Sequence, residues 1–223
     1  MHFLKKILSA ATLSFAAAGA FASPTAPVEG ADYQVLKAPQ PTDTGKKIEV
    51  IEFFAYWCPH CATFDPILSA WVKKQGDNIV FKRVHVSHSD RFLPQQKLYY
   101  TLESLGLADQ YQSKVLAAIH QGGKDLQRDE EVLDWVGANG IDKAKFTDAY
   151  RSFGVAGKTR RAKSMMESYQ VEYWPLLVVD GRWQASPSLT GKANENLNTE
   201  TAQQQATTQV LDALVAKAKA GKK

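Results

Sequence analysis

The stretch that decides the fold runs from Val50 to Cys61 and reads VIEFFAYWCPHC. Its first part, Val50 to Trp57, carries apolar side chains on both faces of an extended chain. That is typical of a central strand covered by helices on each side. Its last part, Cys58 to Cys61, contains the only cysteines of the chain, separated by Pro59 and His60. Proline suits the first turn of a helix, so Pro59 supports the site by starting a helix there.

The flanking sequence extends this pattern to a strand–helix–strand unit. An apolar stripe at helical spacing follows the cysteines, and its members are Phe64, Ile67, Leu68, Trp71 and Val72. Pro66 lies inside the stripe and should kink the helix. A second strand is predicted over residues 79–86, and a parallel return to the sheet completes the unit.

Helical periodicity dominates residues 89–170, where we expect four or five consecutive helices that form an inserted subdomain. The sheet resumes with a hairpin of 176–179 and 182–185 around Asp180-Gly181, whereas 186–198 is polar and is predicted to be a loop. The predicted class is α/β, with a central mixed sheet flanked by helices. The predicted divisions are a signal peptide over 1–22, a first sheet segment over 23–88, the insertion over 89–170 and a second sheet segment over 171–223.

The N-terminus has the form of a signal peptide. Lys5 and Lys6 precede an uncharged apolar run over 7–21, and Ala20-Phe21-Ala22 matches a signal-peptidase site, so we expect cleavage after Ala22. An uncleaved membrane anchor is the alternative, but the run is short and rich in small residues. Export implies an oxidising compartment. Without the two lysines the formal charge falls from +4 to +2, which argues against a nucleic-acid partner or a charged membrane surface.

The cysteine pair is better explained by chemistry than by structure, because a disulfide closing so short a loop constrains the unfolded chain little. At a helix start, Cys58 meets unpaired N–H groups and the positive dipole end, which lower the pKa of its thiol. The dipole contributes about 0.3–1 kcal/mol and up to ~2 kcal/mol in favourable sites, or roughly one pKa unit, and His60 can add a positive charge or a ring N–H. We expect an exposed attacking sulfur at Cys58 and a shielded resolving sulfur at Cys61.

Stabilising the thiolate favours the reduced form, which makes the pair an oxidant.

Other interpretations of the cysteine pair stay open. A zinc site would need two further ligands, for which His60, His85 and His88 are candidates, but no second ligand pair has the usual spacing. The pair could be an inert disulfide, and His60 an ordinary surface residue. We expect no metal, and no cofactor beyond the disulfide within the chain.

The segment from Glu52 to Cys61, EFFAYWCPHC, together with the signal peptide and the helical insertion, resembles the DsbA family of periplasmic thiol oxidases in the thioredoxin superfamily. The resemblance covers nearly the whole mature chain, and reductants of the superfamily usually carry Gly-Pro between the cysteines. It implies a thioredoxin fold with an inserted helical domain. It also implies oxidation of reduced exported proteins in the periplasm and reoxidation by the membrane protein DsbB. We expect a monomer.

Two charged residues match the family more loosely. Glu52, six residues before Cys58, resembles the family's buried acid, and Lys82 on the next strand resembles its buried lysine partner. Such a pair would relay the proton that Cys61 loses when it resolves a mixed disulfide. An ordinary ion pair between strands is an equally good interpretation.

Pro175 opens the predicted strand 176–179, where thioredoxin-like proteins place a cis-proline opposite the cysteines. The residue before it would pair with substrate backbone as an added strand. Here that residue is Trp174, whereas the family usually has Val or Thr, so docking or the potential is expected to differ. Trp57, next to Cys58, completes the predicted substrate-binding group. The alternative is a trans proline that merely starts the strand.

The function predicted first is a periplasmic dithiol oxidase that donates the Cys58–Cys61 disulfide to reduced exported proteins. A dedicated thiol reductase or isomerase of the same superfamily is the alternative, although no N-terminal dimerisation domain is evident. A non-catalytic periplasmic peptide-binding protein is a third reading. Retention of both cysteines with His60 between them argues against it.

Overall fold

The computed structural model describes residues 23–222, so the predicted signal peptide and its cleavage site after Ala22 lie outside the described residues. The strands are β1 (Tyr33–Val35), β2 (Ile48–Phe54), β3 (Ile79–His85), β4 (Leu176–Val179) and β5 (Trp183–Ala185). They form a mixed sheet in the order β1-β5-β4-β2-β3. β2 runs parallel to β3 and antiparallel to β4, and every residue of β2 is buried, so the prediction of a central strand is confirmed.

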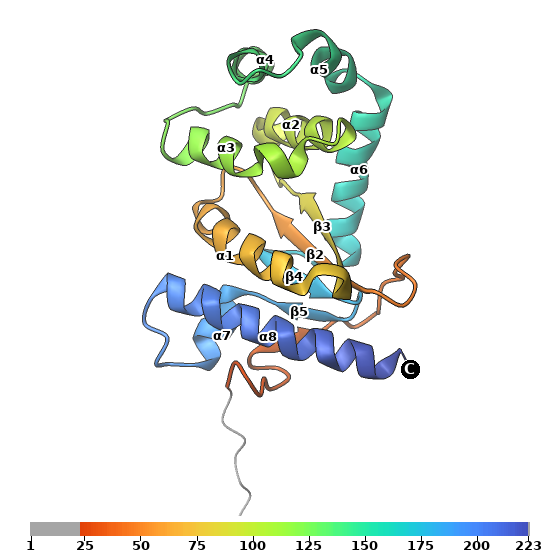
Figure 1. Cartoon of the computed structure of the whole chain (residues 1–223), viewed down its shortest axis with the longest axis vertical. Coiled ribbons are helices and arrows are strands. Elements are labelled where there is room, and N and C mark those ends of the chain that lie inside the picture. The colour runs from red at the N-terminus through yellow and green to blue at the C-terminus, as the bar shows by residue number, and fades with distance from the viewer. Residues whose placement is uncertain (1–22, 223) are drawn as a thin grey trace, which may run out of the picture.

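Helices cover both faces of this sheet (Figure 1). On the face that carries Ile48 and Val50, α1 (Pro59–Gln75) and α8 (Glu200–Gly221) pack through a shared apolar core. On the opposite face, Ile51 and Phe53 join a second core. Its helices are α2 (Leu93–Ser104), α3 (Ala108–His120), α4 (Asp129–Ala138), α5 (Lys143–Tyr150) and α6 (Phe153–Ser168).

The five helices α2 to α6 follow one another between β3 and β4, which confirms the inserted helical subdomain. In Figure 1, α2 to α5 gather beyond one end of the sheet and α6 runs back alongside it. The position of the insertion matters for function, because the chain re-enters the sheet at Pro175, beside the start of α1. Among the helices of residues 23–222, none has the length and apolar character needed to span a bilayer.

The prediction of a loop over 186–198 is wrong for its first half, which forms α7 (Pro187–Ala193). Ser186 caps this helix, since its Oγ accepts a hydrogen bond from the backbone N–H of Leu189 at 3.1 Å. Pro187 occupies the first turn, where a missing N–H costs nothing. The helix is short and has no long apolar stripe, so hydrophobic periodicity does not reveal it. Its only sequence signal is the N-cap serine.

Candidate active site

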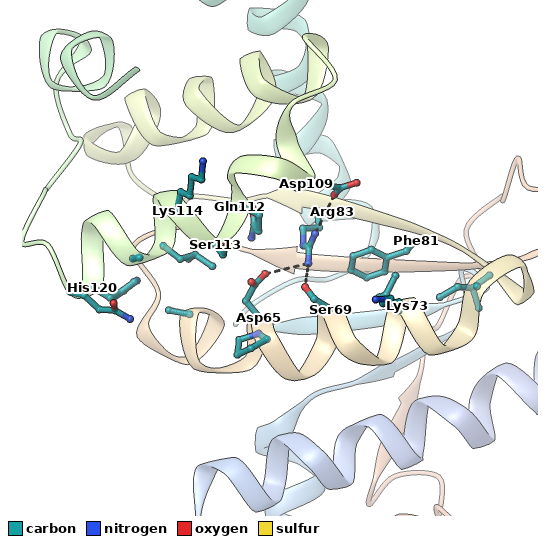
Figure 2. Close-up of a pocket in the computed structure, with 18 residues that line it drawn as sticks. Asp65, Ser69, Lys73, Phe81, Arg83, Asp109, Gln112, Ser113, Lys114 and His120 are labelled. Carbon is teal, nitrogen blue, oxygen red and sulfur yellow. Dashed lines mark hydrogen bonds and ion pairs between the residues drawn. The ribbon is translucent and has the colours of Figure 1, made fainter. Parts of the chain in front are cut away.

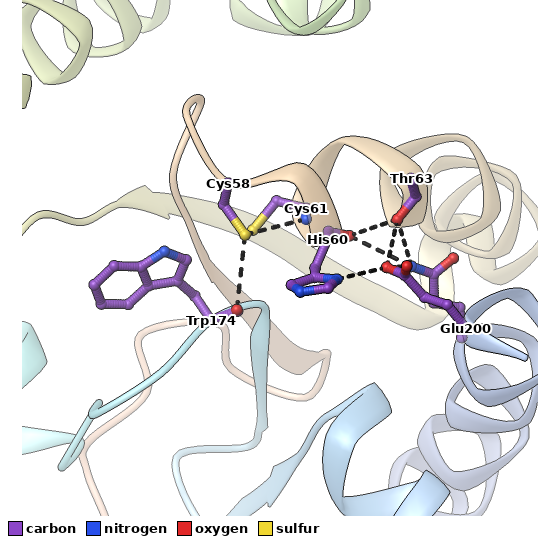
Figure 3. A network of polar contacts seen from close by, with 7 residues as sticks. Cys58, His60, Cys61, Thr63, Trp174 and Glu200 are labelled. Carbon is purple, nitrogen blue, oxygen red and sulfur yellow. Dashed lines mark hydrogen bonds and ion pairs between the residues drawn. The ribbon is translucent and has the colours of Figure 1, made fainter. Parts of the chain in front are cut away.

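The step from β2 into α1 places Cys58 at the N-cap of the helix, with φ −81° and ψ 115°. Its Sγ accepts a hydrogen bond from the backbone N–H of Cys61 at 3.3 Å (Figure 3). Pro59 occupies the first turn, as predicted. Local sequence is enough to build this arrangement, because a buried strand that ends in a proline-started helix aims free N–H groups at the capping side chain.

The expected contrast in exposure between the two sulfurs is not found. Cys58 is 4% exposed and Cys61 is 1% exposed, so both are buried. The segment before β4 lies against Cys58, and the carbonyl oxygen of Trp174 accepts a weak hydrogen bond from its Sγ at 3.8 Å. The packed segment, which is distant in sequence, therefore shields a thiol that the helix start alone would leave open.

The two thiols nevertheless differ strongly in acidity. The pKa of Cys58 is lowered, first by a hydrogen bond from the Cys61 thiol, then by the backbone N–H of Cys61 and the charge of His60, and burial opposes this shift. The pKa of Cys61 is raised well above its ordinary value, first by burial and then by its hydrogen bond to Cys58 and the charge of Glu52. When the reduced pair loses a proton, the charge therefore forms on Cys58.

The ring of His60 pairs with a carboxylate from α8. Its Nδ1 lies 2.9 Å from Oε1 of Glu200 (Figure 3), so this nitrogen binds the carboxylate and the ring assists Cys58 by charge. Glu200 raises the pKa of His60, chiefly through this hydrogen bond. Glu200 lies 140 residues from His60 in the chain, and no local pattern links the two, so sequence reasoning missed it.

The predicted pairing of Glu52 with Lys82 is wrong. Strand register sets Glu52 opposite Arg83 and Ile51 opposite Lys82, and successive side chains of a strand point to opposite faces. Arg83 donates to Glu52 at 2.8 Å. Lys82 instead donates to Asp43 at 2.6 Å and Glu49 at 2.7 Å on the other face. Counting the alternation along both strands would have found Arg83.

Glu52 is a buried acid with an unusual affinity for protons. It is 1% exposed, and burial raises its pKa from 4.5 to about 7, although the charge of Arg83 opposes the shift. Arg83 also contacts Asp65 and Ser69, each at 3.2 Å. Arg83, Asp65 and Ser69 line a cavity of about 1040 Å³, which neither Glu52 nor either cysteine lines. Figure 2 shows Arg83 beside Asp65 and Ser69 at this cavity.

The peptide bond between Trp174 and Pro175 is cis, which confirms the predicted isomer. The Trp174 ring packs edge-on against Trp57 at 5.4 Å between centroids, and Trp57 stacks on Phe92 at 4.5 Å. An aromatic wall thus borders Cys58 on one side. Trp174 also lines a cavity of about 480 Å³ together with His60, Pro175 and Glu200.

The histidines proposed as zinc ligands do not lie together around a common site among the described residues. His85 is fully buried, and its Nε2 accepts the backbone N–H of Tyr56 at 3.0 Å. Burial lowers its pKa to about 3. Over residues 23–222, no group of three or more His, Cys, Asp or Glu side chains is placed to hold a metal ion.

Comparison with known proteins agrees with this geometry. The thioredoxin family model matches residues 40–100. The thiol:disulfide interchange protein DsbA of Burkholderia cepacia is 43% identical over 190 residues, covering 84% of this chain and 90% of that protein. The crystal structure of Pseudomonas aeruginosa DsbA superposes with a TM-score of 0.75 at 31% identity, covering 87% of this chain and 95% of that one.

Reduced DsbA1 from Neisseria meningitidis gives a TM-score of 0.73 at 25% identity, covering 87% of this chain and 96% of that one. The likeness therefore includes the helical insertion as well as the sheet. This chain also has a cysteine pair at the start of α1, a lowered pKa at Cys58 and a cis-proline next to Cys58. The chain belongs to the DsbA family, and it is a thiol:disulfide oxidoreductase with the thioredoxin fold.

Proposed function

We propose that the Cys58–Cys61 pair works in the oxidising direction, as the disulfide donor of a periplasmic dithiol oxidase. The observation that carries this proposal is the place of Cys58 at the N-cap of α1, where its Sγ accepts the N–H of Cys61 at 3.3 Å. In keeping with this geometry, the pKa is lowered at Cys58 and raised at Cys61. A stabilised Cys58 thiolate favours the reduced pair over the disulfide, so electrons flow into this protein from client thiols.

The exchange proceeds in two balanced steps. A client thiolate attacks Sγ of Cys58, the bond between Cys58 and Cys61 breaks, and Cys61 leaves with the electron pair and takes up a proton. A second client thiolate then attacks the client sulfur of the mixed disulfide and releases Cys58 as a thiolate. The client gains a disulfide, and this chain is reduced by two electrons. Reoxidation reverses the roles, with Cys58 as nucleophile and Cys61 resolving.

Glu52 is suited to handle the proton of Cys61. A carboxyl whose pKa is about 7 can both give and take a proton near neutral pH, and its charge is one of the causes that raise the pKa of Cys61. Arg83 holds Glu52 in place, so we assign to Arg83 the partner role that the sequence suggested for Lys82. A purely structural ion pair would leave the rate of the Cys61 step unchanged when Glu52 is replaced.

Clients dock beside the cysteine pair. The backbone of Trp174 lies against Cys58, so an extended client can pair with it as an added strand, while Pro175 and Trp57 border the same place. We expect reduced exported proteins as clients and a membrane reoxidase resembling DsbB as electron acceptor. We also expect a monomer that uses no metal and no nucleic acid, and cleavage of the signal peptide after Ala22.

Replacing His60 with serine should weaken the oxidant. His60 is one of the groups that lower the pKa of Cys58, and an exposed charge contributes up to about 1 kcal/mol. Because about 30 mV corresponds to ~1.4 kcal/mol, the potential should fall by about 20 mV. Equilibration with glutathione measures it, with Lys74→Ser, which removes an exposed cation from the last turn of α1, as the control.

The direct test of the proposed function is oxidation of a reduced, unfolded protein with scattered cysteines by a stoichiometric amount of the oxidised chain. We expect rapid transfer of one disulfide per chain and recovery of free Cys58 and Cys61. Slow transfer, or net reduction of client disulfides, would instead identify a reductase.

A further inference from the structure

Three hydrogen-bond donors converge on one oxygen of Glu200 (Figure 3). Oε1 lies 2.9 Å from Nδ1 of His60, 2.7 Å from Oγ1 of Thr63 and 2.9 Å from Nε2 of Gln204. Gln204 also donates to Oγ1 of Thr63 at 2.7 Å. Two of the donors come from α1 and one from α8, so Thr63 and Gln204 fix the carboxylate in position beside the imidazole ring.

We propose that Glu200 is a positioning residue of the active site, which fixes and pairs with the imidazole ring of His60 and acts through that ring on the thiolate of Cys58. Its use in catalysis rests on the oxidase function proposed above, whereas the coupling itself does not. The result is an electrostatic coupling from Glu200 through His60 to Cys58, which links the start of α8 to the start of α1.

A role limited to helix capping does not explain this geometry. An acid at the start of α8 gains from the helix dipole, but Thr199 already caps this helix, since its Oγ1 accepts the N–H of Ala202 at 3.1 Å. The hydrogen bonds of Oε1 of Glu200 run instead to side chains, two of them on α1. The carboxylate is therefore placed to serve the neighbouring helix.

The electrostatic effect has a definite sign and a limited size. Glu200 raises the pKa of His60. The groups that face His60 are Cys58, Glu200 and, across the cavity, Lys192 of α7. The side chains of His60 and Glu200 are 66% and 42% exposed, so solvent screens the pair. Exposed ion pairs are weak, so the rise in the pKa of His60 that Glu200 causes is small.

The pH range of the effect follows from that sign. In acid solution His60 is cationic with or without Glu200. Just above its normal pKa, near about 6.5, the paired ring retains its proton in a larger fraction of the molecules than an unpaired ring does, so the thiolate of Cys58 more often has a cationic neighbour. Loss of Glu200 should therefore weaken the oxidant near neutral pH and leave it unchanged in acid, where the ring is charged either way, and in alkaline solution, where it is neutral either way.

The test compares Glu200→Gln with Glu195→Gln, which removes the same charge from an exposed position in the connection before α8. Glutamine keeps an oxygen that can accept from Thr63, so the fold is retained. Proton NMR titration of His60 should show a lower pKa in Glu200→Gln and an unchanged one in Glu195→Gln. The equilibrium constant with glutathione should fall by up to about twofold at about pH 7 and not at about pH 5.5.

Two outcomes would overturn the assignment. One is an unchanged His60 titration in Glu200→Gln. The other is a loss of oxidising strength that persists in a His60→Ser background, because an effect that acts through the ring must vanish without it. If wild-type protein proves to be a weak oxidant while the His60 titration still moves, the oxidase function fails and the coupling of Glu200 to His60 stands.

Discussion

Replacing Cys61 with serine should leave a protein that becomes trapped as a mixed disulfide at Cys58. The thiolate of reduced Cys58 attacks glutathione disulfide and displaces one glutathione. In the wild type, Cys61 then attacks Cys58 and displaces the second. Without Cys61 the mixed disulfide has no internal resolving thiol. Mass spectrometry after brief reaction should therefore find one glutathione on each Cys61→Ser chain and none on the wild type.

The matched control is Cys58→Ser, which leaves Cys61 as the attacking thiol. Burial raises the pKa of Cys61 well above its ordinary value, whereas the pKa of Cys58 is lowered. Since only the thiolate attacks, this variant should react at least about a hundredfold more slowly near neutral pH. Similar rates for the two single-cysteine variants would contradict the assignment of attacking and resolving roles.

Replacing Glu52 with glutamine should stabilise the protein in neutral solution and not in acid. Burial raises the pKa of Glu52 from 4.5 to about 7, so the folded chain keeps a proton that the unfolded chain has lost. The free energy of unfolding falls as pH rises through the range in which the folded state binds more protons than the unfolded state. The contribution of Glu52 is thus fully present below its unfolded pKa and is lost as pH rises to about 7. Glutamine stays neutral and escapes this loss.

The shift corresponds to a difference of about 3 kcal/mol. Urea unfolding of both proteins should give nearly equal free energies of unfolding at about pH 4 and an advantage of roughly that size for Glu52→Gln at about pH 8. Glu49→Gln is the control, since Glu49 is buried on the opposite face of β2 and pairs with the half-exposed Lys82. A pH-independent difference between wild type and Glu52→Gln would contradict a proton held on Glu52.

The same substitution bears on catalysis. If Glu52 relays the proton of Cys61, Glu52→Gln should slow resolution of a mixed disulfide at Cys58 and leave its formation unchanged, which stopped-flow measurement can separate. Slowing of both steps equally would instead indicate a general disturbance of the site.

Much of the site follows from local sequence, because its main elements are local. The buried strand before Cys58 and the proline after it fix the start of α1, and the alternation along β2 places Glu52 among apolar neighbours. These features depend on neighbours within a few residues of the chain. The cis bond at Pro175 and the role of Glu52, in contrast, were expected from the resemblance to a known family.

The errors arise where distant segments meet. The partner of Glu52 was missed by one position, because register and side-chain alternation between β2 and β3 decide that Arg83, not Lys82, shares its face. The burial of Cys58 depends on Trp174, and the pairing of His60 depends on Glu200. Packing between distant segments determines these contacts, and the hydrophobic pattern within a single helix or strand does not predict them.

The preference of Cys58 for the thiolate form is tested most directly by the reduction potential of the Cys58–Cys61 pair, measured by equilibrating the protein with glutathione buffers. A strong oxidant should lie at least about 100 mV above the roughly −270 mV of thioredoxin. A potential at or below that of thioredoxin would mean that the disulfide is the more stable form, and that electrons leave this protein instead of entering it.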